Sequence, residues 1–104
     1  DNMINTAMRD YSYFLLEDNS YGQQTIKKDK NGKPVAQGTI KLAINTTSQS
    51  VQDNINYSQA TYIGLTHSHV TDAYVIQYGD RKLKVLYVNT LGRYNQVFMG
   101  DYNG

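Results

Sequence analysis

The chain of 104 residues contains no cysteine, no tryptophan and only one proline. Without cysteine, disulfides and thiolate metal sites are excluded. No segment approaches the roughly 18 apolar residues that a membrane-spanning helix needs, and the mean hydropathy is -0.60. The charge is nearly balanced, with 10 basic and 9 acidic residues. Such a balanced charge does not favour a protein that binds nucleic acid through its phosphates.

Ten tyrosines stand out against two phenylalanines, and tyrosine suits half-buried strand positions. Three segments of β-branched and aromatic residues lie close together near the end of the chain: Tyr74–Tyr78, Leu83–Val88 and Tyr94–Met99. Turn signals at 79–81 and 89–92 separate them. The pattern predicts a three-strand meander, and the rest of the chain must cover its buried face.

Four further segments predict strands: 10–16, 21–28, 35–44 and 60–66. In the first, Tyr11, Tyr13 and Leu15 alternate with Phe14 and Leu16, so these two sets should occupy opposite faces. The third contains Gly38, which interrupts the alternation and suggests a β-bulge. Polar turns are expected at 17–20 and at Asn31-Gly32, a dipeptide typical of hairpins.

These elements predict an all-β fold: a small single-domain β-barrel of six to seven mainly antiparallel strands with one long polar loop. We expect the barrel domain to cover residues 10–100. Residues 1–9 would be an N-terminal arm or an expression remnant, and residues 101–104 a C-terminal tail.

The long polar loop, residues 45–59, carries a single formal charge and supplies no core face. Long loops within compact domains are often functional, but a plain surface excursion explains the composition equally well. The residues that we assign to a candidate channel or gating loop are Asn45, Thr46, Thr47, Ser48, Gln49, Ser50, Val51, Gln52, Asp53, Asn54, Ile55, Asn56 and Tyr57.

Basic residues gather at two predicted hairpin ends, and they form a candidate docking surface. They either keep strand edges from aggregating or dock the chain on an acidic partner or on DNA. The residues concerned are Lys28, Lys30, Lys33, Arg81 and Lys82.

Candidate catalytic groups are sparse. His67 and His69 could share a strand face and bind zinc with Asp72, but a surface connection explains them as well. No serine is paired with a convincing histidine and carboxylate, and no glycine loop opens a helix. We therefore expect no enzyme, no cofactor and no metal, with a metal-dependent enzyme that uses the two histidines as an alternative.

The order of motifs from Tyr62 resembles the head–tail joining (head-closure, or stopper) proteins of long-tailed, siphovirus-type bacteriophages. The resemblance rests on YIGLTH at 62–67, YVIQY at 74–78, KVLYV at 84–88 and GRY at 92–94, and it extends over about residues 10–99. Tyr21-Gly22 matches a turn of that family, and the polar loop follows the first long strand as in its members. The usage of Asn, Lys, Tyr and Ile suits a phage of a Gram-positive host.

The resemblance implies a structural virion protein at the head–tail interface, made in the host bacterial cytoplasm. It would form a homo-oligomeric ring, about twelvefold, below the portal and adaptor proteins and above the tail completion protein. The ring would close the capsid around its packaged double-stranded DNA and dock the tail, with the polar loop in the channel, away from any membrane. The alternatives are a tail terminator or tail-completion protein and a small OB- or SH3-like nucleic-acid-binding module using Lys84 and Tyr87.

Overall fold

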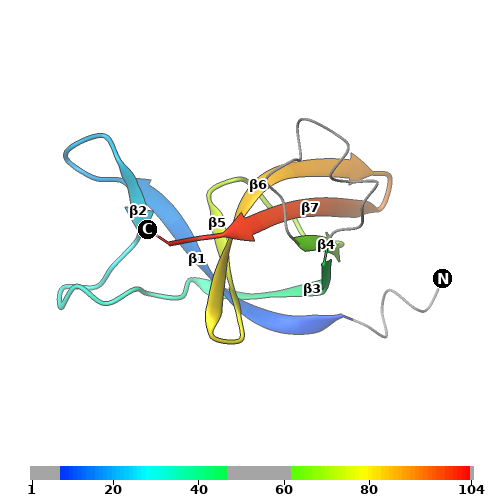
Figure 1. The fold of residues 1–104 in the computed structure, drawn as a ribbon, viewed down its shortest axis with the longest axis horizontal. Coiled ribbons are helices and arrows are strands. Elements are labelled where there is room, and N and C mark those ends of the chain that lie inside the picture. Colours follow the sequence, from blue (N-terminus) through cyan, green and yellow to red (C-terminus); the bar gives the residue numbers. More distant parts are fainter. Residues whose placement is uncertain (1–7, 47–61, 104) are drawn as a thin grey trace.

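The computed structural model describes residues 8–46 and 62–103, which form strands joined by turns and extended segments (Figure 1). No helix long and apolar enough to cross a membrane occurs among them. The all-β class is confirmed. The strands in chain order are β1 (Arg9–Asp18), β2 (Gln24–Ile26), β3 (Gly38–Thr46), β4 (Tyr62–Thr66), β5 (Tyr74–Tyr78), β6 (Arg81–Leu91) and β7 (Tyr94–Asp101).

Six of these strands close into an antiparallel barrel in the order β1-β3-β4-β7-β6-β5. The closing contact joins β5 back to β1, with Tyr13 opposite Ile76 and Phe14 opposite Val75. β2 stays outside the barrel and pairs with the last residues of β1. The predicted small barrel is therefore confirmed, with six strands in the barrel and one beside it.

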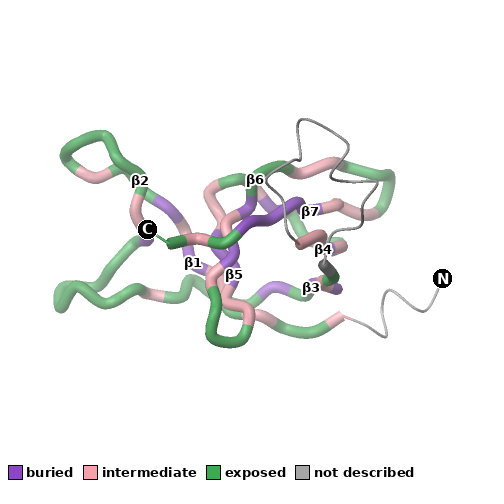
Figure 2. Tube along the Cα trace, viewed as in Figure 1, coloured by how far each residue is buried: buried purple, intermediate pink, exposed green. Residues whose placement is uncertain are grey.

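Alternate residues of the strands pack together in the barrel interior, as the period of two requires. Figure 2 shows where the buried residues lie along the strands. Leu42, Ile76, Leu83 and Met99 are fully buried there. Tyrosine rings pack against this core from several strands. Tyr13 stacks on Tyr74 with ring centroids 4.8 Å apart, and Tyr78 contacts both Tyr11 and Tyr62, at 5.8 and 5.4 Å.

A second, smaller core lies between the barrel and β2. It contains Phe14 and Leu16 of β1, Ile26 of β2 and Val75 of β5, and Tyr102 packs against it. The alternation predicted for the first strand is thus confirmed, because Tyr11 and Tyr13 contact the barrel core while Phe14 and Leu16 form the second core.

A β-bulge occurs in β6, at a position that the sequence pattern did not indicate. Val85 pairs with Met99 and Tyr87 with Phe98, so Leu86 is the extra residue. The insertion shifts the alternation by one residue. Val85 and Val88 consequently both contact the barrel core, while Leu86 is exposed.

The bulge predicted at Gly38 is wrong. Gly38 begins β3 and pairs with Tyr13 in an unbroken register. A Cβ at Gly38 would lie 3.3 Å from Cε2 of Tyr13. The glycine therefore allows the tyrosine ring to lie against the backbone, and this close approach, not a bulge, is what it provides.

Several predicted boundaries were also wrong because pairing with a neighbour extends the strands. Glu17 and Asp18, predicted as turn residues, pair with Thr25 and Gln24. Residues 89–91 belong to β6, which leaves a two-residue turn at Gly92-Arg93. At the other extreme, β2 covers only three of the residues predicted for the 21–28 strand.

Candidate interaction surface

An arm extends from one end of the barrel, on the left in Figure 1. We define it as residues 16–36: the end of β1, β2 and the hairpin that follows. Its first turn is organised by Asn19, whose Oδ1 accepts hydrogen bonds from the amides of Tyr21 at 2.8 Å and Gln23 at 3.0 Å. Gly22 closes the turn at a φ of 79°, which favours glycine.

The second turn of the arm repeats this arrangement. Oδ1 of Asp29 accepts from the amides of Asn31 at 2.9 Å and Lys33 at 3.0 Å, and Gly32 has a φ of 81°. Asn31 has a negative φ, so the turn is a three-residue loop closed by a left-handed glycine and not a two-residue Asn-Gly turn. Side-chain capping of this kind gives both tips a defined shape.

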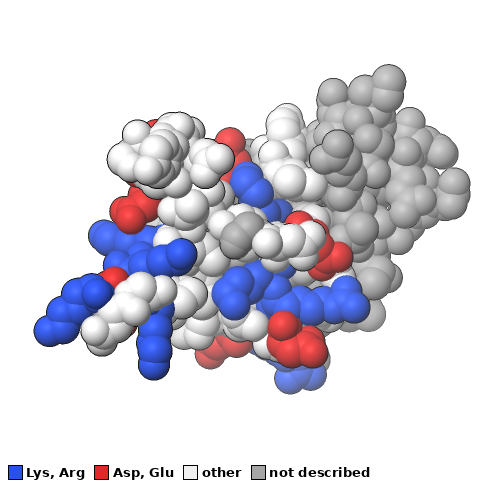
Figure 3. Space-filling view, turned by 60° about the vertical axis from the view of Figure 1, so that its left-hand side comes forward, with Lys and Arg blue, Asp and Glu red and all other residues white. Residues whose placement is uncertain are grey.

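The two tips carry different side chains. Tyr21, on the first, is 86% exposed. Lys28, Lys30 and Lys33 lie exposed on the second hairpin. Figure 3 shows basic side chains over the arm and the adjoining barrel face, with single acidic groups between them.

A groove lies between the arm and the end of the chain, and we call it the lysine groove. Its volume is about 380 Å³. Ile26 is a buried part of its lining and Tyr102 is half-buried. No carboxylate side chain lines it among the residues that the structure describes. The lining residues are Thr25, Ile26, Lys28, Gly32, Pro34, Lys82, Tyr102 and Asn103.

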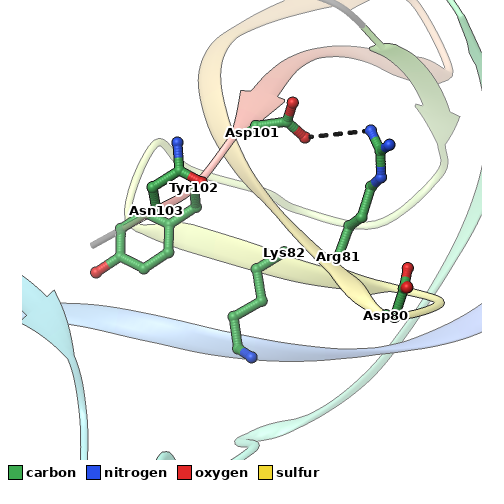
Figure 4. A pocket seen from close by; sticks show the side chains of 6 residues that line it. All are labelled: Asp80, Arg81, Lys82, Asp101, Tyr102 and Asn103. Carbon is green, nitrogen blue, oxygen red and sulfur yellow. Dashed lines mark ion pairs between the residues drawn. The ribbon is translucent and has the colours of Figure 1, made fainter.

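A second hollow of about 370 Å³ adjoins the lysine groove and shares Lys82, Tyr102 and Asn103 with it (Figure 4). Here the charges are compensated. Nη1 of Arg81 lies 3.8 Å from the Asp101 carboxylate and donates a hydrogen bond to the Tyr62 hydroxyl at 3.0 Å. Figure 4 shows the Lys82 side chain pointing away from this ion pair.

The amine of Lys82 lies 5.4 Å from the centre of the Phe14 ring, a cation–π contact between the groove and the second core. The tail beside it is fixed as well, because the Tyr102 amide donates to the Lys82 carbonyl at 2.8 Å.

The structure brings together part of the predicted docking surface. Lys28 and Lys82, which are far apart in the sequence, line one groove, and Arg81 lies in the adjoining hollow. Lys30 and Lys33 lie on the arm but line neither hollow. Sequence patterns did not indicate the remaining lining residues. Only the continued register of β6 and β7 would have placed Tyr102 beside Lys82.

The structure describes only the first two residues of the predicted loop. Asn45 and Thr46 are not loop residues, because they pair with Ile63 and Tyr62 and so extend β3. Residues 47–57 lie outside the described part of the chain.

The histidine site of the metal-dependent alternative gains no third ligand from the described residues. Nδ1 of His67 lies 3.3 Å from the Arg93 carbonyl, and its ring packs on Tyr94 at 4.6 Å. Among the described residues, no group of three His, Asp or Glu side chains could hold a metal ion.

Lys84, which the nucleic-acid-binding alternative would use, is hydrogen-bonded within the fold. Its amine donates to the carbonyls of Asp72 and Val85, each at 3.1 Å. It therefore braces the segment before β5 and does not belong to the lysine groove.

Fold and surface together define a small closed β-barrel with a braced basic arm. A search of protein-family models and a search of curated proteins each gave no match for this chain.

Proposed function

We propose that the chain is a structural subunit of the neck of a long-tailed bacteriophage, a head-closure protein. Copies would form a ring, about twelvefold, below the portal and adaptor proteins. The ring would retain the packaged DNA and present the surface on which the tail docks. The observation that carries the proposal is the arm, a preformed projection on a barrel whose own strands are all paired.

The arm is suited to contacts between subunits because it needs little ordering on binding. Both of its turns are capped by their own side chains. Its base is held by the second core, in which Leu16 and Ile26 of the arm pack with Phe14 and Val75 of the barrel. Preformed elements lose less conformational entropy on association than flexible ones. Exposed tyrosines such as Tyr21 are frequent anchors of protein interfaces.

Two further points support head closure over the alternatives. Tail terminators usually carry a substantial helix packed on a sheet, and the described residues contain no helix. A nucleic-acid-binding module would need a concentrated positive field, whereas the net charge is +1 and Lys84 is bonded within the fold.

Electron microscopy of connectors from the phage that encodes the chain tests the proposal directly. A ring of this barrel is expected between the adaptor and the tail. A phage with Tyr21→Ser and Lys28→Glu should release tailless heads that have lost their DNA, because the ring that would retain it fails to form. The matched control is Arg93→Glu, an exposed cation on the β6–β7 turn away from the arm. Connectors that lack the chain would refute the proposal.

A further inference from the structure

The lysine groove combines cations with an apolar floor. Lys28 and Lys82 supply two positive charges, and Ile26, Pro34 and Tyr102 supply apolar surface. Asp29, the acidic residue next to Lys28, accepts hydrogen bonds from the amides of its own turn. The groove therefore has a net positive charge that no lining side chain neutralises, and its chemistry fits a ligand that carries both carboxylates and apolar groups.

An open strand edge lies beside these side chains. Among the described strands, β2 pairs with β1 alone, whereas every barrel strand pairs with at least two others. Thr25 and Ile26 belong both to β2 and to the groove lining. The unpaired amides and carbonyls of an edge strand favour the addition of another extended segment.

The walls of the groove are fixed before any ligand arrives. The Val35 amide donates to the Lys27 carbonyl at 3.1 Å and joins the two sides of the second hairpin, directly after β2. On the opposite side, the Tyr102 amide is bonded to the Lys82 carbonyl at 2.8 Å. A preformed groove of about 380 Å³ accommodates a few side chains of a peptide.

We propose that the lysine groove binds an extended acidic segment of a partner protein. The segment would add to β2 as a further strand, with its carboxylates near Lys28 and Lys82 and its apolar side chains against Ile26 and Tyr102. A DNA duplex fits less well, because phosphates gain nothing from the apolar floor and cannot donate hydrogen bonds to the carbonyls of the strand edge. The inference concerns the isolated chain and holds whether or not the chain is a neck subunit.

Titration of the isotope-labelled full chain, followed by NMR, tests the inference. The probe is an acetylated octapeptide in which pairs of aspartates alternate with pairs of valines, so that each face of the extended peptide carries both residue types. The control peptide has lysine in place of aspartate. The acidic peptide should shift the amides of Ile26, Lys28 and Tyr102, and the basic peptide should leave them unchanged. Added salt should weaken the binding.

Two single variants locate the binding within the arm. Lys28→Glu reverses a charge of the groove and should weaken the acidic peptide roughly tenfold. Lys30→Glu makes the same change on the same turn, outside the groove, and should have little effect. Both residues are exposed, so both variants should fold.

Three outcomes would overturn the inference. The acidic peptide could leave the groove amides unshifted, or Lys30→Glu could weaken it as much as Lys28→Glu. A short DNA duplex could also bind the same residues more tightly than the peptide, which would assign the groove to nucleic acid. Failure in this experiment would leave the electron microscopy test of the ring unaffected.

Discussion

Thr66 is a polar residue that the fold buries completely. Its hydroxyl donates to the Lys41 carbonyl at 2.6 Å and accepts the Ser68 amide at 3.0 Å. Thr66→Val keeps the shape but leaves both backbone groups without this partner. The free energy of unfolding should fall by about 1–3 kcal/mol, as measured by urea denaturation.

Thr66→Ser is the control for the hydroxyl, because it keeps both hydrogen bonds and removes one methyl group. It should cost about 0.8 kcal/mol. A valine variant as stable as the wild type would show that the hydrogen bonds of Thr66 contribute nothing to stability.

The tyrosines beside the barrel core predict a loss of stability in alkali. Burial raises the pKa of Tyr11 above 10.0, and the neighbouring Tyr78 raises it further, although Arg9 acts in the opposite direction. Burial likewise raises the pKa of Tyr74, with a contribution from Tyr13. Both rings therefore bind their protons more tightly in the folded chain than in the unfolded one.

The contribution of these two tyrosines to stability is complete below the unfolded pKa, near 10.0. It is lost as the pH rises through the higher pKa of the folded chain. Urea midpoints should consequently be independent of these groups up to about pH 9 and decline above pH 10. Tyr11→Phe should make the decline shallower, whereas Tyr21→Phe, at an exposed position, should leave it unchanged.

At the scale of the elements, the sequence predicted strands well where turn residues mark both ends. β5 has the predicted bounds because Gly79 follows it directly. The end of β6 was missed because Asn89 and Thr90 are turn formers in isolation, while pairing with Gln96 and Asn95 keeps them extended. Thr90 even donates a hydrogen bond to the Asn95 side chain at 3.0 Å. Cross-strand partners override local preference here.

The sequence predicted some residues of the candidate site but not that they lie together. The sequence marks Lys28 and Lys82 as basic hairpin residues. Their meeting in one groove depends on the β1–β5 closure and on the second core, which fold the arm back beside the end of β7. These contacts join distant parts of the chain, and no local pattern encodes them.

The pairing of β3 with β4 predicts that the segment between them can be shortened. Thr46 lies opposite Tyr62, so the two residues are placed as the flanks of a two-residue hairpin turn. Replacing residues 47–61 with Asn-Gly should leave the barrel folded. The shorter connection should lower the entropic cost of closing this loop by roughly 1–2 kcal/mol.

Backbone amide spectra of this variant should match the wild type across β5 and β6, which pair with neither β3 nor β4, the strands that flank the replaced segment. Loss of the dispersed spectrum would mean that the segment is needed for the barrel itself.

At the scale of the whole molecule, closure of the barrel limits how copies can associate. Each of its six strands pairs with two other barrel strands, and β2 alone, among the described strands, has an open edge. A ring needs two different surfaces on each copy, whereas two β2 edges can pair only with one another. β2 is three residues long, which is too short for a stable strand-to-strand dimer. We therefore expect the isolated chain to be a monomer.

Light scattering after gel filtration should give a mass near 11.8 kDa from dilute to concentrated samples. Addition of the portal and adaptor proteins should move the chain into a ring-sized particle, because the proposed ring assembles on a template. Lys28→Glu should stay monomeric alone and should enter that particle less readily if the arm contacts the neighbours. A stable dimer of the isolated chain would contradict this view, and a dimer that Lys28→Glu leaves intact would place the contact surface outside the arm.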